Sequence, residues 1–471
     1  MSVAAALERL EQLADSGPVA RLSAAFSAGG HEFALVGGPI RDAFLDRAVT
    51  DLDFATNASP ERILELVTPI SETQWDVGRE FGTIAARIDG QTVEITTYRA
   101  DSYDGSTRKP TVAFGDTLEL DLVRRDFTIN AMALRLPERV LVDPWGGLDD
   151  LLAQRITTPG PPETSFGDDP LRMLRAARFT SQLGFTVAEP TVRAMSDLAP
   201  RIEIVSVERI SDELSKLLRT DDPVPGIRLL VETGIAKLVI PEIPALRLEI
   251  DEHAHHKDVY EHSLTVLTQA IELEKQRGHK PDIVLRLAAL MHDIGKPATR
   301  KIEAGGVVTF HHHDVVGSKL AGKRLRALRF DNDTIAAVSR LIELHLRFFG
   351  YTDGAWTDSA VRRYVRDAGA LLERLHILTR ADVTTRNRKK ADRLGFAYDD
   401  LEHRVAAIAE AEGIAALRPD LDGEQIMAIL GLKPGREVGE AYRFLLELRL
   451  DDGPLGAVVA EARLREWWVG R

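Results

Sequence analysis

The pattern of apolar and polar positions changes character along this 471-residue chain. Residues 1–28 place leucine, alanine and phenylalanine at helical spacing, which predicts an N-terminal helix. From about 31 to 145, short β-branched runs alternate with helical segments, which is typical of an α/β or α+β domain. Strands are predicted at 33–36, 52–54, 83–88, 93–98 and 140–142, and helices at 39–46, 59–67 and 125–134.

Beyond the proline-rich turn at 159–162, the pattern is almost entirely helical. A last helical region, 386–471, is broken by proline and glycine at 418–423, 433–435 and 452–454. We therefore expect an α+β fold, in which a mixed sheet with helices is followed by mostly α-helical domains. The clearest helices of the second part are predicted at 171–183, 207–219, 225–233 and 262–274.

Composition narrows the class of protein. The chain has no cysteine, which excludes disulfides, thiolate catalysis and zinc–cysteine sites. We expect no membrane span, no signal peptide and a cytoplasmic protein, because no apolar run reaches about 18 residues and residues 1–9 are already charged. A net charge of −13 argues against a protein coated in nucleic acid, but basic tracks such as 386–390 allow local RNA contacts.

The most informative motif joins a glycine turn, within 35–42, to two carboxylates two residues apart. Side chains at i and i+2 of a strand share one face, so Asp51 and Asp53 would present their oxygens side by side. Hard oxygen ligands suit Mg²⁺, and the bare backbone of Gly37 and Gly38 lets phosphates approach closely. Together they predict a metal-dependent nucleotidyl transfer site.

A two-metal site needs a further carboxylate from a neighbouring strand, and Glu94 is the best candidate. Val93 and Ile95 would then face the core. The alternative is that Glu94 only belongs to the polar face of an amphipathic strand.

Two later segments can hold a nucleotide. Segment 124–131 combines basic residues with an amide at the start of a predicted helix, a place suited to triphosphate and ribose. Asp169 and Arg172 are three residues apart and can together read a base edge, although a helix cap and a surface ion pair would look the same. The candidate nucleotide-binding residues are Gly37, Gly38, Arg41, Arg125, Asp126, Asn130, Asp169, Arg172, Arg175 and Arg178.

Histidines are concentrated between 253 and 345, where an apolar helix ends in the adjacent pair His292 and Asp293. A lone histidine on an apolar helix is usually a satisfied core residue. An adjacent His-Asp pair with further histidines on separate helices favours a metal site, because imidazole and carboxylate suit a divalent transition metal or Mg²⁺.

Five segments of the chain resemble, in order, the successive motifs of bacterial class II tRNA nucleotidyltransferases, the CCA-adding enzymes, whose close relatives are the bacterial poly(A) polymerases. The resemblance implies a polymerase-β-like head followed by a helical neck, body and tail. It also implies that Asp51 and Asp53 bind catalytic Mg²⁺, with Glu94 as third carboxylate, and that Asp169 and Arg172 replace a nucleic-acid template. The segments are 35–56, 124–131, 143–149, 168–185 and 208–214.

One position departs from that family. Glutamate usually stands where this chain has Asp168, and aspartate has a shorter reach, so we assign Asp168 no base contact.

The histidine-rich region resembles the HD metal-dependent phosphohydrolases, some of which hydrolyse phosphomonoesters or 2′,3′-cyclic phosphates. The resemblance implies four core metal ligands, His262, His292, Asp293 and Asp382. His313 and His345 could complete a second metal position, and the choice among His311, His312 and His313 stays open.

We therefore predict an N-terminal helix (1–30), a catalytic head (31–157), a neck (158–250), an HD domain (251–385) and a tail (386–471). The predicted activity is template-independent addition of CCA to tRNA from CTP and ATP, with an HD phosphohydrolase or cyclic phosphodiesterase. The alternatives are a poly(A), CC-adding or A-adding enzyme, an HD phosphohydrolase whose head only binds RNA, and a non-catalytic tRNA-binding protein. The predicted RNA phosphate contacts are Arg386, Arg388, Lys389 and Lys390.

Overall fold

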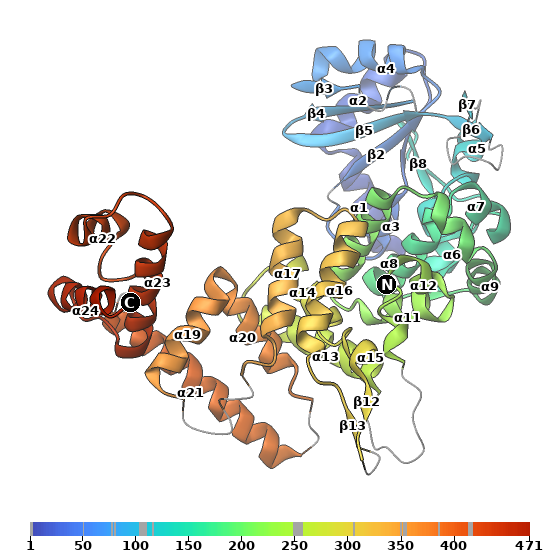
Figure 1. Cartoon of the computed structure of the whole chain (residues 1–471). Coiled ribbons are helices and arrows are strands. Elements are labelled where there is room, and N and C mark those ends of the chain that lie inside the picture. Colours follow the sequence, from blue (N-terminus) through green and yellow to red (C-terminus); the bar gives the residue numbers. More distant parts are fainter. Residues whose placement is uncertain are drawn as a thin grey trace. The chain divides into compact units, whose positions relative to one another are not determined.

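The computed structural model divides into two compact units, Met1–Pro241 and Glu242–Arg471 (Figure 1). The first unit contains the segments predicted as N-terminal helix and head and most of the predicted neck, and the finer division into five regions stays a prediction. Among the residues that the structure describes, no helix is both long and apolar enough to cross a membrane. The described residues are 3–49, 51–76, 79, 82–102, 111–114, 117–247, 258–304, 307–348, 351, 356–384, 387–412 and 418–471.

A seven-stranded mixed sheet, ordered β3-β4-β5-β2-β1-β8-β9, forms the framework of the first unit (Figure 1). Only β2 and β5 pair in parallel, and the other neighbours in this sheet are antiparallel. The strands predicted at 33–36, 83–88 and 140–142 are confirmed with the same bounds. The strands of this sheet are β1 (Phe33–Val36), β2 (Leu52–Thr56), β3 (Thr73–Trp75), β4 (Thr83–Ile88), β5 (Gln91–Thr97), β8 (Ala133–Leu136) and β9 (Val140–Val142).

The register between β2 and β5 decides which side chains meet. Asp53 lies directly beside Glu94, and paired residues of neighbouring strands point to the same face. The next pair along the strands, Phe54 and Ile95, is buried on the opposite face. The expectation that Val93 and Ile95 face the core is therefore confirmed.

The N-terminal segment forms two helices, α1 (Val3–Ala14) and α2 (Gly17–Ala28), so the single helix predicted over 1–28 is wrong. Pro18 occupies the first turn of α2. A proline there has no N–H to donate and favours an extended residue before it, which ends α1 and starts a new helix. Two further helices, α3 (Gly38–Phe44) and α4 (Pro60–Val67), match predicted ones within two residues.

The helix predicted over 125–134 is also wrong. After α5 (Leu118–Val123), the chain forms one 3₁₀ turn, η3 (Thr128–Asn130), and then enters β8 between β1 and β9. Ile129, Met132 and Ala133 are completely buried. A short apolar run that is buried on all sides has no amphipathic period, so its pattern cannot separate a helix from a strand.

Helices complete the first unit, and α8 is their centre. It packs against α10 and α11, and Gly226 on α11 lies so close to α8 that an added Cβ would stand 2.3 Å from the carbonyl oxygen of Ala177. The helix predicted at 171–183 is confirmed with the same bounds. These helices are α6 (Gly147–Leu152), α7 (Pro162–Asp168), α8 (Leu171–Leu183), α9 (Glu189–Asp197), α10 (Val207–Leu218), α11 (Val224–Glu232) and α12 (Ile235–Val239).

The described part of the second unit is built from helices and the small hairpin of β12 (Lys301–Ile302) and β13 (Val308–Thr309). Its core contains a fully buried ion pair between Arg286 and Oε2 of Glu274. The other carboxylate oxygen of Glu274, Oε1, accepts the backbone N–H of Asp282 at 2.6 Å. The helices around this core are α13 (Val259–Gln276), α14 (Ile283–Met291), α15 (Lys296–Thr299), α16 (His313–Ala327), α17 (Asn332–Leu344), α19 (Asp358–Ala368) and α20 (Leu372–Ala381).

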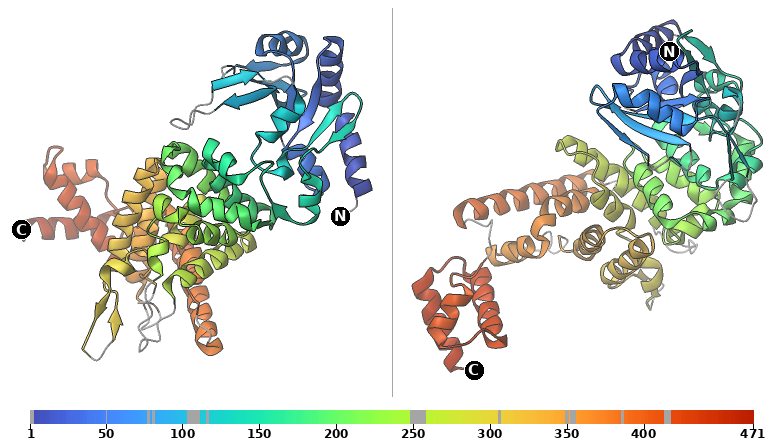
Figure 2. Two further views of the ribbon diagram at one scale, coloured as in Figure 1. Left: turned by 90° about the vertical axis from the view of Figure 1, so that its right-hand side faces the viewer. Right: turned by 90° about the horizontal axis from the view of Figure 1, so that it is seen from above.

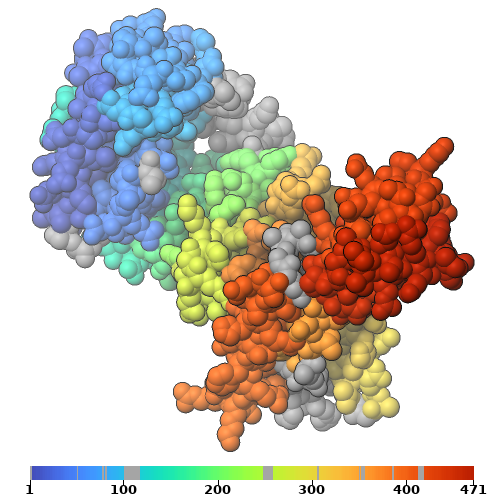
Figure 3. All heavy atoms as spheres, turned by 90° about the vertical axis from the view of Figure 1, so that its left-hand side faces the viewer, coloured from blue at the N-terminus to red at the C-terminus, as the bar shows by residue number. Residues whose placement is uncertain are grey.

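The chain ends with the long helix α21 (Arg388–Glu412) and three helices that pack around a small core of their own, coloured red in Figure 2. In the space-filling view this cluster forms a rounded lobe (Figure 3). The predicted breaks fall between helices and are confirmed. The three helices are α22 (Gly423–Leu430), α23 (Arg436–Asp452) and α24 (Ala457–Val469).

Candidate functional site

Three carboxylates meet at the sheet of the first unit. Asp51 directly precedes β2, Asp53 is the second residue of β2, and Glu94 lies beside it on β5. Burial raises the pKa of Asp53 to about 6, and the carboxylates of Glu94 and Asp51 raise it as well, against the opposing charges of Arg125 and Arg41. The structure thus brings together the three carboxylates that the sequence analysis selected.

This cluster fits a divalent cation. All three side chains offer hard oxygen ligands. Burial raises the pKa of Asp53 although Arg125 and Arg41 oppose the rise, so its ionised form is disfavoured in the protein alone. A bound cation would stabilise that ionised form.

The glycine turn lies next to this cluster. Gly37, between β1 and α3, has φ +75°, a conformation that favours glycine. An added Cβ would stand 2.9 Å from Nη1 of Arg125, so the same glycine also leaves room for that guanidinium. Gly38 starts α3, and Arg41 lies one turn later on the same helix.

A continuous hydrogen-bond chain links α3 to the neck helices. Arg41 Nη1 donates to Asn130 Oδ1 at 2.7 Å, and Asn130 Nδ2 donates to Asp126 Oδ1 at 2.9 Å. Arg175 Nε on α8 then donates to Asp126 Oδ2 at 2.8 Å. Burial would raise the pKa of Asp126, but Arg175 and the bond from Asn130 hold it at about 2. Asp126 therefore stays ionised and anchors both side chains.

The chain continues through Glu213 on α10. This buried carboxylate accepts Arg178 Nε at 2.7 Å and lies 3.5 Å from Arg175 Nη1. Arg41, Arg175 and Arg178 all lie within 5.4 Å of the ring centroid of Phe179. Three guanidinium groups are thus gathered around one ring, and each is also paired with a carboxylate, Arg41 with Asp42, Arg175 with Asp126 and Arg178 with Glu213.

Asp169 and Arg172 stand at the turn between α7 and α8. Asp169 accepts the backbone N–H of Leu171 at 3.2 Å through Oδ1, and its Oδ2 pairs with Arg209 at 3.1 Å. Arg172 donates through Nη1 to Ser165 Oγ at 2.7 Å, and through Nη2 to the carbonyl oxygen of Arg124. Both side chains are therefore held by other partners, so the surface ion pair of the alternative does not form. The bond that Asp169 accepts from Leu171, the first residue of α8, does fit the helix-capping part of that alternative.

Three residues of this region were absent from the sequence-derived set: Ser165, Arg209 and Glu213. The sequence could have indicated Glu213, because this residue falls on the apolar face of α10 with Ile210 and Leu217. A buried carboxylate at such a position needs a hydrogen-bonding or charged partner. Ser165 gave none, since its contact depends on how α7 meets α8.

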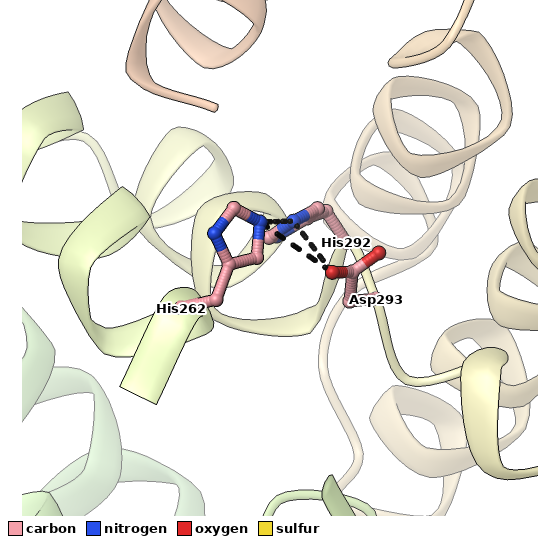
Figure 4. Close-up of side chains that lie close together, drawn as sticks. All are labelled: His262, His292 and Asp293. Atoms are coloured by element: carbon pink, nitrogen blue, oxygen red, sulfur yellow. Dashed lines mark hydrogen bonds and ion pairs between the residues drawn. The ribbon is translucent and has the colours of Figure 1, made fainter. Parts of the chain in front are cut away.

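Six side chains converge in the second unit, and each belongs to a helix end. His262 Nε2 lies 3.3 Å from His292 Nε2 and 3.6 Å from Asp293 Oδ2 (Figure 4). Asp293 Oδ1 lies 3.3 Å from His313 Nε2, so its two oxygens face two groups of ligands. The groups, each with atoms within 4.8 Å of one another, are His262–His292–Asp293 and Asp293–His313–His345. Asp382 Oδ1 joins the first at 2.9 Å from His262 Nε2.

The histidines are fixed in orientation through their other ring nitrogen. Because a carbonyl oxygen can only accept, a carbonyl-bound Nδ1 must carry the proton, which leaves Nε2 to face the cluster. Nδ1 of His292, His313 and His345 lies 2.9, 2.8 and 2.6 Å from the carbonyl oxygen three residues earlier. His262 Nδ1 lies 3.0 Å from Thr384 Oγ1. This is how metal-binding histidines are oriented.

The buried Nε2 of His345 has no hydrogen-bond partner among the described residues. Burial and the charge of His292 lower the pKa of His345 to about 4, so its imidazole is neutral and able to coordinate a metal. Burial opposes a charge on His292, but Asp293 and Asp382 raise its pKa to about 9, which shows that the cluster attracts positive charge. These residues fit a divalent metal centre.

The choice among the three consecutive histidines follows from the backbone. His312 has φ +62° and caps α16, which turns the chain so that His313 enters the cluster while His311 and His312 stay exposed. Beside the ligands, Lys296 Nζ lies 2.6 Å from Asp293 Oδ2.

Of the predicted RNA contacts, Arg388, Lys389 and Lys390 are exposed in the first turn of α21. Arg386 lies outside the described residues.

Comparison with known protein families gives three matches in chain order. The Poly A polymerase head domain matches residues 33–157, and the probable RNA and SrmB-binding site of polymerase A matches 184–246. The HD domain matches 259–387. The first covers the sheet with its three carboxylates, and the last covers all six clustered side chains of the second unit.

Whole proteins give the same picture. The A-adding tRNA nucleotidyltransferase of Deinococcus radiodurans is 34% identical over 425 residues, which are 88% of this chain and 91% of that enzyme. The CCA-adding enzyme of Bacillus subtilis is 42% identical over 207 residues, but the match spans only 44% of this chain and about half (51%) of that enzyme.

The fold is similar to a solved structure of this kind. The CCA-adding enzyme of Bacillus stearothermophilus in complex with CTP superposes with a TM-score of 0.70 at 25% sequence identity, covering 97% of this chain and 99% of that one. The expected fold, a head with a mixed sheet followed by helical domains, is confirmed. This chain belongs to the family of bacterial tRNA nucleotidyltransferases and poly(A) polymerases that carry an HD domain.

Proposed function

We propose that this protein adds C, C and A, without a nucleic-acid template, to the 3′ end of tRNA from CTP and ATP. The observation that carries the proposal is the register that sets Glu94 beside Asp53, next to Asp51 and the Gly37 turn. The similarity to a tRNA nucleotidyltransferase over most of the chain, and to a CTP-bound CCA-adding enzyme in fold, supports it.

In this proposal Asp51, Asp53 and Glu94 would hold two Mg²⁺ ions, which would supply charge to neutralise the triphosphate and to lower the pKa of the RNA 3′-hydroxyl. The 3′-oxygen forms a bond to the α-phosphorus and its proton passes to water. The bond from the α-phosphorus to the bridging oxygen breaks, and pyrophosphate leaves. Gly37 and Gly38 leave room for the triphosphate at the turn into α3. Arg41 and Arg125 supply fixed positive charge, which stabilises the charge that develops on the phosphates.

Base selection would belong to Asp169 and Arg172. Cytosine and adenine both present an exocyclic amine donor next to a ring nitrogen acceptor. Asp169 can accept from the amine and Arg172 can donate to the ring nitrogen. Uracil and guanine present the opposite order, so the same pair would reject them. Arg175 and Arg178, anchored on Asp126 and Glu213, are proposed to complete the nucleotide site.

One observation favours a second candidate. The relative that matches 88% of this chain is an A-adding enzyme, so addition of the terminal adenosine alone is the second proposed activity. Either activity has tRNA as its substrate, and we propose the cytoplasm as the site of action.

For the second unit we propose a metal-dependent phosphohydrolase or cyclic phosphodiesterase. The four oriented histidines, Asp293 and Asp382 would hold one or two divalent metals, and imidazole ligands suit transition metals. The unpartnered buried Nε2 of His345 supports metal binding most directly.

We also propose Arg388, Lys389 and Lys390, with Arg386, as contacts to tRNA phosphates. Positive charges at the N-terminal end of a helix interact unfavourably with its dipole, so the three basic residues in the first turn of α21 do not stabilise that helix. An anion bound at this end would remove the conflict.

The first prediction concerns the reaction. With Mg²⁺ and tRNAs that end before CCA, after C or after CC, labelled CTP and ATP should extend each to CCA and then stop. Single-nucleotide gels measure the products. Extension only of the tRNA ending in CC makes the protein an A-adding enzyme, and a long adenosine ladder makes it a poly(A) polymerase. The Asp53→Asn variant should add nothing, and activity in this variant would contradict the assigned metal ligands.

The second prediction concerns stability. With a pKa of about 6 in the folded protein against an ordinary 3.8, Asp53 binds more protons when folded, so stability should fall as pH rises through this window. Without metal at about pH 7.5, Asp53→Asn should raise the free energy of unfolding by on the order of 2 kcal/mol, measured by urea denaturation. The control is Asp197→Asn, which changes an exposed aspartate of α9 in the same unit. An unchanged free energy of unfolding would show that the carboxylates do not strain the fold.

The third prediction concerns the metal centre. The wild-type protein should retain a divalent metal, measured by mass spectrometry, and hydrolyse a phosphomonoester or a 2′,3′-cyclic phosphate. The double variant His292→Ala/Asp293→Ala should lose both. His279→Ala, an exposed histidine paired with Glu373, is the matched control. Equal hydrolysis by wild type and double variant would reject the catalytic role, and equal metal content would reject the site.

The fourth prediction concerns RNA affinity. Replacing Arg388, Lys389 and Lys390 by alanine should weaken tRNA binding and reduce the slope of log affinity against log salt by about two to three. Filter binding at several salt concentrations measures the slope. The control replaces the exposed Lys319, Lys323 and Arg326 of α16, which removes the same charge. Equal slopes in the two triple variants would show that Arg388, Lys389 and Lys390 make no specific contact with tRNA phosphates.

A further inference from the structure

Ser165 contacts both members of the proposed base-reading pair. Its carbonyl oxygen accepts the backbone N–H of Asp169 at 3.1 Å. Its hydroxyl oxygen accepts Arg172 Nη1 at 2.7 Å. The side chain is buried, one turn before the end of α7. A single residue therefore ties down the backbone of one partner and the side chain of the other.

The remaining contacts make this arrangement rigid. The backbone N–H of Arg172 donates to the carbonyl oxygen of Asp169 at 3.1 Å, which fixes the spacing of the two residues. Arg172 Nη2 donates to the carbonyl oxygen of Arg124, and Arg209 holds the carboxylate of Asp169. Of these contacts, only the hydroxyl of Ser165 and the carbonyl of Arg124 hold the guanidinium itself. The carbonyl is backbone, so the hydroxyl is the contact that a substitution can remove.

The chemistry of the hydroxyl suits this task. A hydroxyl accepts a hydrogen bond without neutralising the guanidinium, so Arg172 keeps its full charge and its other N–H groups for a ligand. A carboxylate at this position would compete with the ligand for the same donors. Arginine side chains otherwise have many rotamers, and immobilising one beforehand lowers the entropy lost on binding.

We propose that Ser165 is a positioning residue for nucleotide selection, because it fixes the order in which Asp169 and Arg172 present an acceptor and a donor. This inference rests on the proposed function of that pair. The fixed order matches cytosine and adenine and mismatches uracil and guanine. When the hydroxyl is absent, the guanidinium is free to turn, and the order is no longer enforced. Ser165 therefore acts on selectivity, through Arg172, without touching the reacting atoms.

The experiment compares Ser165→Ala with wild type in single-nucleotide addition to tRNA, using CTP, ATP, UTP and GTP separately. Ser165→Ala should raise KM for CTP and ATP on the order of tenfold, as expected for the loss of a hydrogen bond to a charged group, with kcat changed much less. The ratio of kcat/KM for UTP or GTP to that for CTP or ATP should rise by a similar factor. This ratio does not depend on the fraction of folded enzyme, so partial misfolding cannot imitate the effect.

Two further variants sharpen the test. Ser165→Thr keeps the hydroxyl and should restore the wild-type ratio. Ser196→Ala removes an exposed hydroxyl that donates to the carbonyl oxygen of Val192 in its own helix, and it should leave the ratio unchanged. A wild-type ratio in Ser165→Ala overturns the inference, as does a ratio in Ser165→Thr that stays at the alanine level. Wild-type enzyme that accepts all four nucleotides alike overturns the proposed function instead.

Discussion

The constraint on which this structure depends is that carboxylates cannot gather in a partly buried space without compensating positive charge. The register of β2 and β5 sets Asp53 beside Glu94. Burial, together with the charges of Glu94 and Asp51, raises the pKa of Asp53 to about 6 although Arg125 and Arg41 oppose the rise. In the second unit, Asp293 and Asp382 raise the pKa of His292 to about 9. In both clusters the ionised carboxylates depend on a neighbouring positive charge, which is arginine at the sheet and protonated His292 among the helices. A cation bound at either cluster would add to or replace that charge.

The positive charge that the protein itself supplies is fixed by a second network. Asp126 stays ionised at full burial because Arg175 and Asn130 hold it, and Asn130 in turn accepts Arg41. The guanidinium next to the carboxylates is thus tied through Asp126 to α8, which also carries Arg172. A displacement of α8 would therefore move Arg41, on the phosphate side of the proposed site, as well as Arg172, on the base side. This coupling is physical, because each step is a hydrogen bond between named atoms.

The sequence predicted those parts whose signal is local. Alternation of apolar and polar residues placed Val93 and Ile95 in the core and therefore Glu94 on the face of Asp53. The helix prediction for 125–134 failed because a segment that is buried on all sides has no exposed polar face to show its period. Glu213 could have been noticed as an acid on an apolar helix face. Ser165 could not, since a serine near a helix end is ordinary, and only the meeting of α7 and α8 brings its hydroxyl to Arg172.

The two clusters also differ in the ligand atoms that they would offer to a cation. The sheet site offers carboxylate oxygen alone, which favours hard cations such as Mg²⁺. The helical site offers four imidazole nitrogens held in one orientation by Nδ1 bonds, which favours transition metals of the first row. Asp293 adds a constraint of its own, because its Oδ1 faces His313 while its Oδ2 faces His262 and His292. A cation bound to one group withdraws charge from the carboxylate that the other group needs. The second metal position should therefore be weaker than the first, so that metal would fill the helical cluster in two steps.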